Sequence, residues 1–483
     1  MTSQLPLTPT PDVVETPKAT QYAKMAADEL EIQNSLSSWR VRREVVIGVV
    51  SLLITFTSAG LILGFGPLYS LLIAEGQWSE LCDPNEPQDG PTCARQEVHL
   101  QYVFSAPFQC LSIANAAFGL LVDIVGPRAC VTFGLLISFL GHLLIAYGTS
   151  TVGMGYSIIA GASMLAIGGY GLYLCSFQFV QLFKRQGFLS AAISGLFNAS
   201  GYVFMLLHIH GVTRKSFFTF YAVLTLVACV GCFVLFPLRS LTQPSAHYTL
   251  SGFSLRMPGI VKPHNVWPVL KPQLKRPDLW FFALYFGWIS TFLAFSGGAI
   301  PDVIFQNAGS DTAAALNYID YVHPLVSNSS FLFTPFMGMF IDRFGFRLSF
   351  AVTSVLILLF LGFLNINSLQ AQIVTFLWYS LAQGFFYSLQ FAYVIVCFPV
   401  EVYGSMQCFI ALFSLSMGFL NYIFTPWAQN TLKGDYTWVL VMFAIPVVLS
   451  FFCLGLIQET IPASARVPKS DDDEHLEKKL SVA

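Results

Sequence analysis

The sequence contains too few charged residues to cover a surface in contact with water. Asp, Glu, Lys and Arg make up 10% of its 483 residues, whereas soluble domains carry about 25%. Hydrophobic residues reach 55%, and the mean hydropathy is +0.65. Lipid must therefore surround most of the chain, where helices satisfy their own backbone hydrogen bonds. A series of soluble domains is excluded, and a net charge of −2 without a basic stripe gives no reason to expect nucleic acid as a partner.

Motifs for catalysis and for metal binding are also missing. The sequence has no H-E-x-x-H, no G-x-S-x-G and no pair of aspartates within an apolar run that would share a proton. His208 and His210 form a His-x-His pair without a Cys or carboxylate close in sequence to complete a metal site. We therefore expect no enzyme activity, no metal and no other cofactor. We also expect no cleavable signal peptide, because residues 1–40 are polar and lack an apolar core.

Twelve apolar runs are long enough to cross a bilayer, which takes about 20 residues in a helix. Six precede the polar stretch 239–278 and six follow it. The predicted fold class is an all-α polytopic membrane protein with twelve transmembrane helices in two six-helix halves. The expected spans are 45–74, 99–122, 129–149, 152–182, 188–210, 216–238, 279–300, 318–341, 348–366, 371–398, 406–427 and 437–457.

The distribution of Lys and Arg orients these spans. With an even number of spans both tails lie on one side, which then carries 20 of the 24 Lys and Arg residues. Cytoplasmic loops are rich in positive charge, so both termini and the central loop are expected in the cytoplasm. The other side holds Arg95, Arg214, Lys215 and Lys433. The predicted domains are a disordered tail at 1–43, a six-helix bundle at 44–238, a central loop at 239–278, a second bundle at 279–458 and a tail at 459–483.

A short motif occurs twice, at equivalent places in the two halves. Residues 119–128, between the second and third spans, read G-L-L-V-D-I-V-G-P-R. Residues 338–347, between the eighth and ninth spans, read G-M-F-I-D-R-F-G-F-R. The glycines, the aspartate and the final arginine recur at a fixed offset of 219 residues. Two copies in equivalent positions indicate an internal repeat.

The two copies resemble the G-x-x-x-D-R-x-G-R signature of the major facilitator superfamily, whose halves are parallel repeats. This resemblance covers the membrane region and implies an alternating-access transporter. It also implies that the Asp and Arg of each motif tie cytoplasmic helix ends together when the substrate path opens outward. The first copy departs from the signature, with Ile124 in place of Arg. The expected gating residues are Gly119, Asp123, Arg128, Gly338, Asp342, Arg343, Arg347 and Glu401.

Three further segments resemble one subfamily, the sodium-independent large neutral amino-acid transporters of the small subunit 3 and 4 type. They are G-P-L-Y at 66–69 followed by A-E-G at 74–76 and L-C at 81–82, Q-E-V at 96–98, and F-P-V-E-V-Y-G at 398–404. The likeness implies facilitated diffusion of neutral amino acids. The expected partners are therefore a small neutral or zwitterionic solute, specifically an amino acid, and the lipid bilayer, with no obligate protein partner.

Lys, Arg, Asp and Glu are absent from the middle of every predicted span, and histidine is the possible exception, with His142 in span three. Each Lys, Arg, Asp and Glu can be placed in a loop, a tail or a helix end, with Asp302 at an outer end. A charge at the bilayer centre costs about 2.5–3.5 kcal/mol, so one that persists there usually serves a proton or a charged substrate. We therefore expect passive transport of a neutral or zwitterionic solute. The alternatives are a proton-coupled or exchange carrier of another small organic solute, and a transporter-like receptor that moves nothing.

Substrate sites in this architecture lie between the halves, often at broken helices. Residues 60–67 combine three glycines with a proline, which predicts a kink or an unwound stretch. The alternative use of these glycines is close helix packing. In span ten, residues 383, 387 and 390 share one helix face. The expected substrate-binding residues are Gly64, Phe65, Tyr170, Tyr173, Asn198, Trp288, Asn328, Gln383, Tyr387, Gln390 and Tyr393.

Two of the ten cysteines lie outside apolar runs. Cys82 and Cys93 belong to a polar segment on the predicted non-cytoplasmic side. That compartment permits disulfides, so we expect a bridge between them, with two free thiols as the alternative. The chain as a whole is expected to be a multi-pass membrane protein, with the plasma membrane favoured over an organelle.

Overall fold

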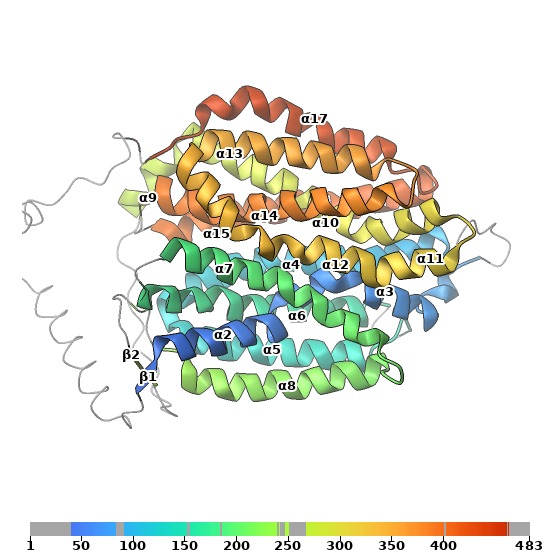
Figure 1. The fold of residues 1–483 in the computed structure, drawn as a ribbon, viewed down its shortest axis with the longest axis horizontal. Helices are drawn as coiled ribbons and strands as arrows, with labels where there is room; N and C mark the ends of the chain where they lie inside the picture. The colour runs from blue at the N-terminus through green and yellow to red at the C-terminus, as the bar shows by residue number, and fades with distance from the viewer. Residues whose placement is uncertain are drawn as a thin grey trace, which may run out of the picture.

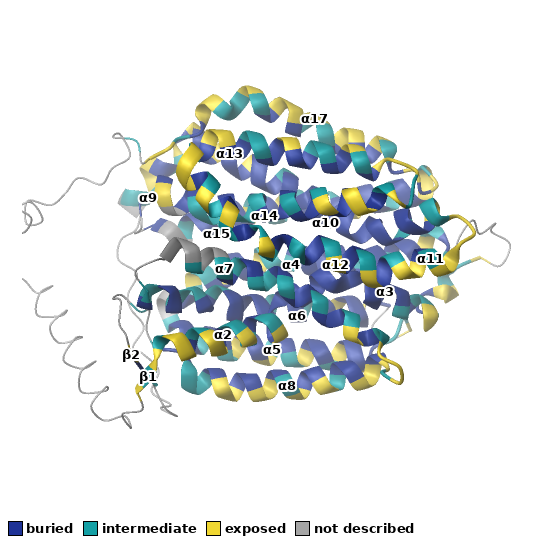
Figure 2. Ribbon diagram, viewed as in Figure 1, coloured by how far each residue is buried: buried dark blue, intermediate teal, exposed yellow. Residues whose placement is uncertain are grey.

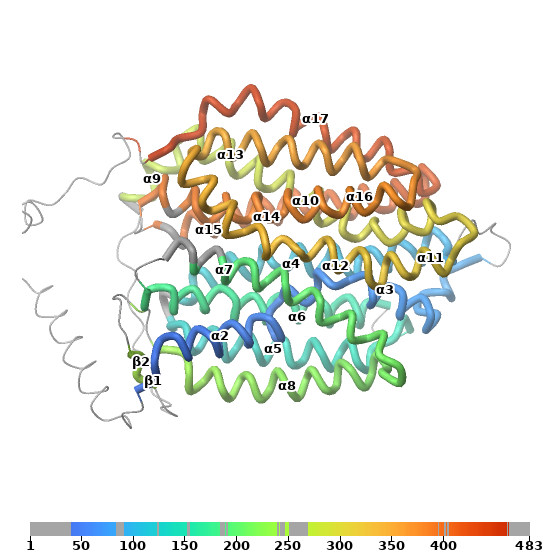
Figure 3. The backbone as a smooth tube through the Cα atoms, in the orientation of Figure 1, coloured from blue at the N-terminus to red at the C-terminus, as the bar shows by residue number. Residues whose placement is uncertain are grey.

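The computed structural model of the chain is a bundle of long helices that run roughly along one axis (Figure 1). The structure describes residues 40–83, 91–151, 155–183, 186–238, 241, 247–250, 267–399, 402–460 and 462. In the view of Figure 1, helices α2, α5 and α8 of the first half lie below, and α13, α14 and α17 of the second half lie above. The tube of Figure 3 shows the same division.

Both halves consist of helices that are interrupted by short 3₁₀ or π segments. The first half contains β1 (Arg40–Arg42), α2 (Arg43–Thr57), η1 (Ala59–Gly64), α3 (Phe65–Ala74), η2 (Ser79–Leu81), α4 (Ala94–Val125), α5 (Pro127–Tyr147), α6 (Ser157–Ser176), η3 (Phe177–Leu182), α7 (Gln186–Ala199), η4 (Ser200–His208), α8 (Arg214–Leu235) and β2 (His247–Thr249). The second contains α9 (Trp267–Leu274), α10 (Pro277–Ala308), α11 (Thr312–Asn317), η5 (Tyr318–Val322), α12 (His323–Ser327), η6 (Asn328–Leu332), α13 (Thr334–Leu364), α14 (Ala371–Cys397), α15 (Tyr403–Gly418), α16 (Asn421–Pro426), η8 (Trp427–Thr431), α17 (Thr437–Cys453) and η9 (Leu454–Leu456).

Within the described residues, nine helical stretches are long and apolar enough to cross a membrane. They are Arg43–Ala74, Ala94–Val122, Pro127–Tyr147, Ser157–Leu182, Arg214–Leu235, Pro277–Ala308, Thr334–Leu364, Ser405–Thr431 and Thr437–Leu456. Their outward-facing side chains are apolar: Phe220 is 63% exposed and Phe452 is 84% exposed. Such side chains suit contact with lipid, and Figure 2 shows the exposed positions along α8 and α17 at the edges of the bundle.

Three of the twelve predicted spans have no separate counterpart among these nine stretches. The range 188–210 consists of α7 and η4, and the range 371–398 is occupied by α14. The range 318–341 is divided among η5, α12, η6 and the start of α13. Helix α13 itself turns at Gly345, where φ is 80° and ψ is 175°. The number twelve, the domain boundaries and the placement of the termini therefore remain predictions.

Span one breaks within the glycine-rich stretch, as its sequence predicts. Helix α2 ends at Thr57, Ser58 adopts an extended conformation, and a 3₁₀ helix follows from Ala59 to Gly64. Neighbouring backbone explains the glycine at position 60, because a Cβ there would lie 1.8 Å from the carbonyl oxygen of Phe197. The break thus brings span one into close contact with α7.

The two ends of the bundle differ in what they carry. Cys82 and Cys93 form the expected disulfide, and we call the end that bears this bridge the outer end. The opposite end, which we call the inner end, carries the antiparallel pair of β1 and β2 and helix α9 (Figure 1). The charge distribution of the sequence predicts that the inner end faces the cytoplasm.

Candidate functional site

A cavity lies between the two halves, and its empty space together with the open solvent at its mouth is about 760 Å³. Helices α4, α6 and α7 line it from the first half, and α10, α13, α14 and α15 line it from the second. The lining residues are Leu63, Phe108, Leu111, Ser112, Asn115, Tyr170, Tyr173, Ser194, Phe197, Asn198, Phe286, Ser290, Thr334, Gln383, Gly384, Tyr387, Ser388, Gln390, Phe391 and Ala411.

The exposed lining of the cavity is mainly apolar, with several hydroxyls and amides, and carries no Asp, Glu, Lys, Arg or His among the described residues. Three of its amides have an unsatisfied oxygen: Asn115 Oδ1, Asn198 Oδ1 and Gln383 Oε1 are buried without a hydrogen-bond partner. A buried acceptor without a donor costs about 1–3 kcal/mol. A solute that brings N–H or O–H groups would recover this free energy, so the lining suits a ligand with hydrogen-bond donors.

Six of the eleven predicted substrate-binding residues lie together in this cavity. They are Tyr170, Tyr173, Asn198, Gln383, Tyr387 and Gln390. The Tyr173 hydroxyl donates to Ser194 Oγ at 3.2 Å, and Gln390 Nε2 donates to Gln407 Oε1 at 3.2 Å. The polar stripe of span ten therefore faces the interface between the halves.

Two predicted residues of span one pack against protein outside the cavity lining. A Cβ on Gly64 would lie 2.2 Å from the carbonyl oxygen of Gly201, so this glycine permits close contact with η4. Phe65 is 2% exposed and packs against the rings of Tyr69 and Phe104. In this structure both residues pack against neighbouring helices. For Gly64 this is the alternative role given above for the glycines of residues 60–67.

The other three predicted residues bind neighbouring helices. Trp288 Nε1 donates to the carbonyl oxygen of Phe443 at 3.0 Å. Asn328 Nδ2 donates to the carbonyl oxygen of Leu63 at 3.5 Å, which links the two halves at a residue that lines the cavity. Tyr393 lies near the inner end and contacts Asp278. Their contact with substrate remains a prediction.

Helix α4 supplies lining residues that sequence reasoning missed. Ser112 and Asn115 face the cavity from this helix, and Ser112 Oγ donates to Ser414 Oγ of α15 at 3.2 Å across the interface. Their spacing of three residues in an apolar span is the same signal that identified the stripe on span ten. Phe286 and Ser290 share one face of α10 through a spacing of four residues. Thr334 lies at the start of α13, and only the packing of the helices reveals it.

An aromatic pair borders the cavity toward the inner end. Phe391 lines the cavity and stacks on Phe177 of η3, with ring centroids 5.8 Å apart. The two rings come from different halves.

The repeated motif adopts the same backbone conformation in both halves. Gly126 has φ 84° and ψ 161°, and Gly345 has φ 80° and ψ 175°. Residues with a Cβ hardly ever adopt this conformation, so both positions require glycine. The final arginines are also equivalent: Arg128 Nε donates to the carbonyl oxygen of Phe236 at 3.1 Å, and Arg347 Nε donates to that of Ile457 at 2.9 Å. Each motif is thus fastened to the last helix of its own half.

The remaining predicted gating residues make fewer contacts. Asp342 and Arg343 are exposed, and neither forms an ion pair within the described part of the chain. A Cβ on Gly119 or on Gly338 would meet nothing within 4 Å. Glu401 and the side chain of Asp123 lie outside the described residues. The gating role of this set remains a prediction.

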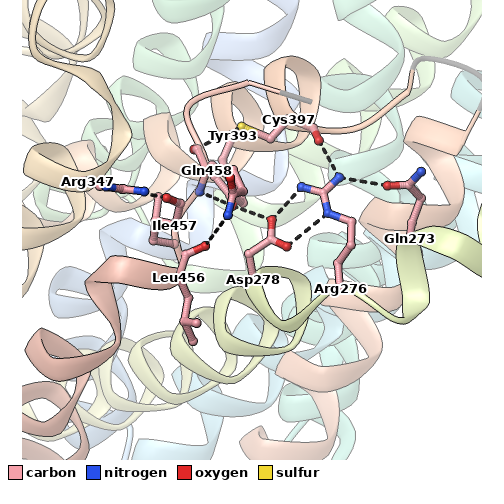
Figure 4. A network of polar contacts seen from close by, with 9 residues as sticks. All are labelled: Gln273, Arg276, Asp278, Arg347, Tyr393, Cys397, Leu456, Ile457 and Gln458. Atoms are coloured by element: carbon pink, nitrogen blue, oxygen red, sulfur yellow. Dashed lines mark hydrogen bonds and ion pairs between the residues drawn. The ribbon is translucent and has the colours of Figure 1, made fainter. Parts of the chain in front are cut away.

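A buried ion pair that the sequence did not suggest joins several elements at the inner end (Figure 4). Arg276 Nη2 lies 2.6 Å from Asp278 Oδ2, and its Nε lies 3.1 Å from Oδ1. Arg276 Nη1 also donates to the carbonyl oxygen of Cys397 at 2.8 Å, and the Tyr393 hydroxyl donates to Asp278 Oδ2 at 2.9 Å. The network holds the start of α10 against the end of α14.

A second polar network closes the outer end, and it corrects an expectation about acidic residues. Glu97 and Asp302 lie near helix ends, as the sequence indicates, but the end of a helix here is not exposed to solvent: Glu97 is 2% exposed and Asp302 is half-buried. Gln101 Nε2 donates to Glu97 Oε1 at 3.1 Å and to the Tyr436 hydroxyl at 2.8 Å. The Tyr436 hydroxyl donates to Asp302 Oδ2 at 2.6 Å. One carboxylate from each half thus belongs to one network.

Tyr436 lies just before α17, and burial together with the Asp302 carboxylate raises its pKa well above the usual value. Its hydroxyl therefore keeps its proton in neutral solution and remains a donor. A second contact between the halves lies nearby, where His208 Nε2 is 3.2 Å from Asp320 Oδ1. No carboxylate lies close to His208 in the sequence, because Asp320 is distant along the chain.

Comparison with known proteins supports the fold more broadly than the function. The chain superposes on a crystal structure of the nucleoside transporter NupG with a TM-score of 0.55, over 85% of this chain and 100% of that one, at 12% sequence identity. The helices, their apolar surfaces and this likeness define the class: a multi-pass α-helical membrane protein with the fold of that solved transporter.

Sequence comparison identifies relatives over shorter stretches. Protein FMP42 of Saccharomyces cerevisiae is 31% identical over 150 residues, which cover 31% of this chain and 30% of that protein. Arginine transporter 1 of Toxoplasma gondii is 27% identical over 114 residues, which cover 22% of this chain and 21% of that protein. The matched stretches thus span less than a third of each relative. No protein-family model matches the chain.

Proposed function

We propose that this protein is an alternating-access transporter that carries neutral amino acids passively, without coupling to sodium or to a proton gradient. The observation that supports this most directly is the cavity between the halves, whose mainly apolar lining offers hydroxyls and amides but no charged residue among the described residues. A zwitterion needs hydrogen bonds at both its ends but no net countercharge. The unsatisfied oxygens of Asn115, Asn198 and Gln383 would accept from its ammonium group.

A hydroxyl group and apolar side chains complete this match. The hydroxyl of Ser290 would donate to the carboxylate of an amino acid. Phe108 and Phe286 would cover an apolar side chain such as that of leucine or phenylalanine. The subfamily resemblance in residues 66–69, 96–98 and 398–404 points to the same substrates.

Alternating access requires barriers at both ends of the cavity. We propose that the repeated motif, including Asp342 and Arg343, forms the inner barrier when the outer end opens. Both residues are exposed at the inner end and are available to pair with a neighbouring helix. The outer barrier is the network around Tyr436.

A second candidate is the transport of nucleosides or nucleobases. The rings of Phe286 and Tyr387 lie beside the amides of Asn115 and Gln383 in the cavity, and such a set suits a flat base with polar edges. The solved neighbour is a nucleoside transporter by its title. Transport of arginine is disfavoured, because no carboxylate among the described lining residues would pair with its guanidinium group.

Uptake by the purified protein in liposomes tests this proposal. Labelled leucine and phenylalanine would be offered with and without a sodium gradient and with and without a pH gradient. We expect saturable uptake in every condition. In Gln383→Leu, which keeps the side chain's size and removes its amide, we expect uptake at low substrate concentration to fall at least tenfold, about 1.4 kcal/mol of lost binding.

Gln372→Leu is the matched control for this variant. Gln372 is buried in the same helix, but it lies outside the cavity lining and donates to the carbonyl oxygen of Ile366. Uptake should survive this change. Uptake that requires either gradient would contradict passive transport, and uptake of nucleosides without uptake of either amino acid would favour the second candidate.

A further inference from the structure

The outer network contains two carboxylates and no cation. Glu97 Oε2 accepts from the Tyr69 hydroxyl at 2.6 Å and from Thr92 Oγ1 at 3.2 Å. Asp302 Oδ2 accepts from Gln429 Nε2 at 2.9 Å and from Gln306 Nε2 at 3.0 Å. Among the described residues no Lys, Arg or His nitrogen lies within 4 Å of either carboxylate. All the groups that face the pair are neutral donors.

The N–H and O–H hydrogens of Gln101, Tyr69 and Tyr436 are all engaged in hydrogen bonds within this network. Both hydrogens of Gln101 Nε2 are donated, one to Glu97 and one to Tyr436, and the hydroxyl hydrogens of Tyr69 and Tyr436 go to the two carboxylates. Gln101 Oε1, on a side chain that is 1% exposed, still has no donor. The network therefore holds more buried acceptors than its own donors can satisfy.

The charges of the two carboxylates also indicate that the network takes up one additional proton. The two carboxylates are linked through the Gln101 amide and the Tyr436 hydroxyl. They repel each other when both are ionised, and burial strengthens the repulsion because the local dielectric constant is low. A single proton on the pair removes the repulsion and adds the missing donor. Pairs of carboxylates that share one proton are a known solution to this conflict.

We propose that Glu97 and Asp302 form a binding site for one proton, which enters from the outer side and holds the two halves together at this end. When the outer end opens, the proton returns to water on the same side and both carboxylates ionise. No proton then crosses the membrane, so the site regulates the passive transport proposed above without driving it. Asp302 is half-buried, which gives the proton a route to outer water.

Other titratable groups near this site are few among the described residues. Arg95 and His99 flank Glu97 on α4, and Lys433 and Asp435 lie in the segment before α17. His99 is half-buried and the other three are exposed. The His208–Asp320 pair joins the halves separately. Acid should therefore favour a closed outer end, and the closure should weaken as the pH rises.

Hydrogen–deuterium exchange on the full chain in lipid nanodiscs tests this site without any substrate, so its result is independent of which solute is carried. Protection factors, corrected for intrinsic exchange rates, would be measured for residues 94–105 and 429–437 at pH 5.5, 7.0 and 8.5. In the wild-type protein we expect protection to fall at least tenfold from pH 5.5 to 8.5. In Glu97→Gln, which mimics the protonated acid, we expect high protection throughout.

Asp311→Asn is the matched control, because Asp311 is an exposed acid of the same end that caps α11, a task that asparagine also performs. This variant should keep the pH response of the wild type. Asp302→Asn gives a second neutral variant with the same expected result if Glu97→Gln fails to fold. Protection that does not change with pH in the wild type would overturn the proposal. So would a full pH response in Glu97→Gln that His208→Gln abolishes, because the histidine would then be the titrating group.

Discussion

At the scale of single residues, the repeated motif depends on two glycines with a backbone conformation that other residues avoid. Gly345 has φ 80° and ψ 175°, and a Cβ there would lie 2.7 Å from Glu459 Oε2. That carboxylate accepts from the backbone N–H groups of Phe346 and Arg347 at 2.6 and 3.0 Å, as an N-cap does. Gly345→Ala should therefore cost about 1–3 kcal/mol through strain alone, seen as a lower midpoint of thermal unfolding in detergent.

Gly362→Ala in the same helix is the control for this prediction. A Cβ at this position would meet nothing within 4 Å, and its backbone is helical. Alanine there should leave the midpoint unchanged or raise it, since alanine favours a helix by up to about 1 kcal/mol over glycine. Equal midpoints for Gly345→Ala and the wild-type protein would show that the turn tolerates a side chain.

At the scale of helices, the inner network ties the start of α10 to the end of α14 through one buried ion pair. Arg276 is 8% exposed and Asp278 is 2% exposed, so removing either charge leaves the other buried without its partner. Such a loss typically costs about 3–5 kcal/mol. Asp278→Asn should thus strongly lower the thermal midpoint, and added salt should not restore it because the pair is shielded from solvent.

An exposed acid provides the comparison for this helix-level prediction. Glu44 pairs with Arg42 and Arg43 at the start of α2, where its side chain is 49% exposed. Glu44→Gln should leave the midpoint within experimental error, because exposed ion pairs contribute little. If both variants unfolded at the same temperature, burial would not explain the importance of the inner pair.

At the scale of the whole molecule, closure of the outer end brings α3 and η5 together from different halves. A Cβ on Gly66 would lie 2.2 Å from the carbonyl oxygen of Ile319, so even a methyl group must push the halves apart there. We expect Gly66→Ala to fold but to resist closing its outer end. Uptake in liposomes should fall at least tenfold, while exchange of residues 312–322 with deuterated water should increase.

Gly48→Ala controls for the effect of alanine in span one, since a Cβ at Gly48 would meet nothing within 4 Å. This variant should transport and exchange like the wild-type protein. Normal uptake by Gly66→Ala would mean that the close approach of the halves at this point is not needed for transport.

Much of the candidate site follows from helical spacing within a single span. Gln383, Tyr387 and Gln390 share one face of α14, and that face lines the cavity. The same reasoning did not place Tyr393, which lies three residues beyond Gln390 but reaches the inner end and bonds to Asp278. Spacing along a helix gives the direction of a side chain, whereas depth in the bundle depends on where neighbouring helices end.

The sequence by itself determined the properties that depend on nearby residues. Lipid as the solvent follows from composition, the apolar runs follow from continuous stretches, and the turns at Gly126 and Gly345 follow from a motif that needs glycine. Only the tertiary structure decided which distant side chains meet: Gln101 and Tyr436 are 335 residues apart along the chain and bond at 2.8 Å. Helix packing sets these contacts, because a hydrogen bond requires placement within tenths of an ångström and sequence separation carries no such information.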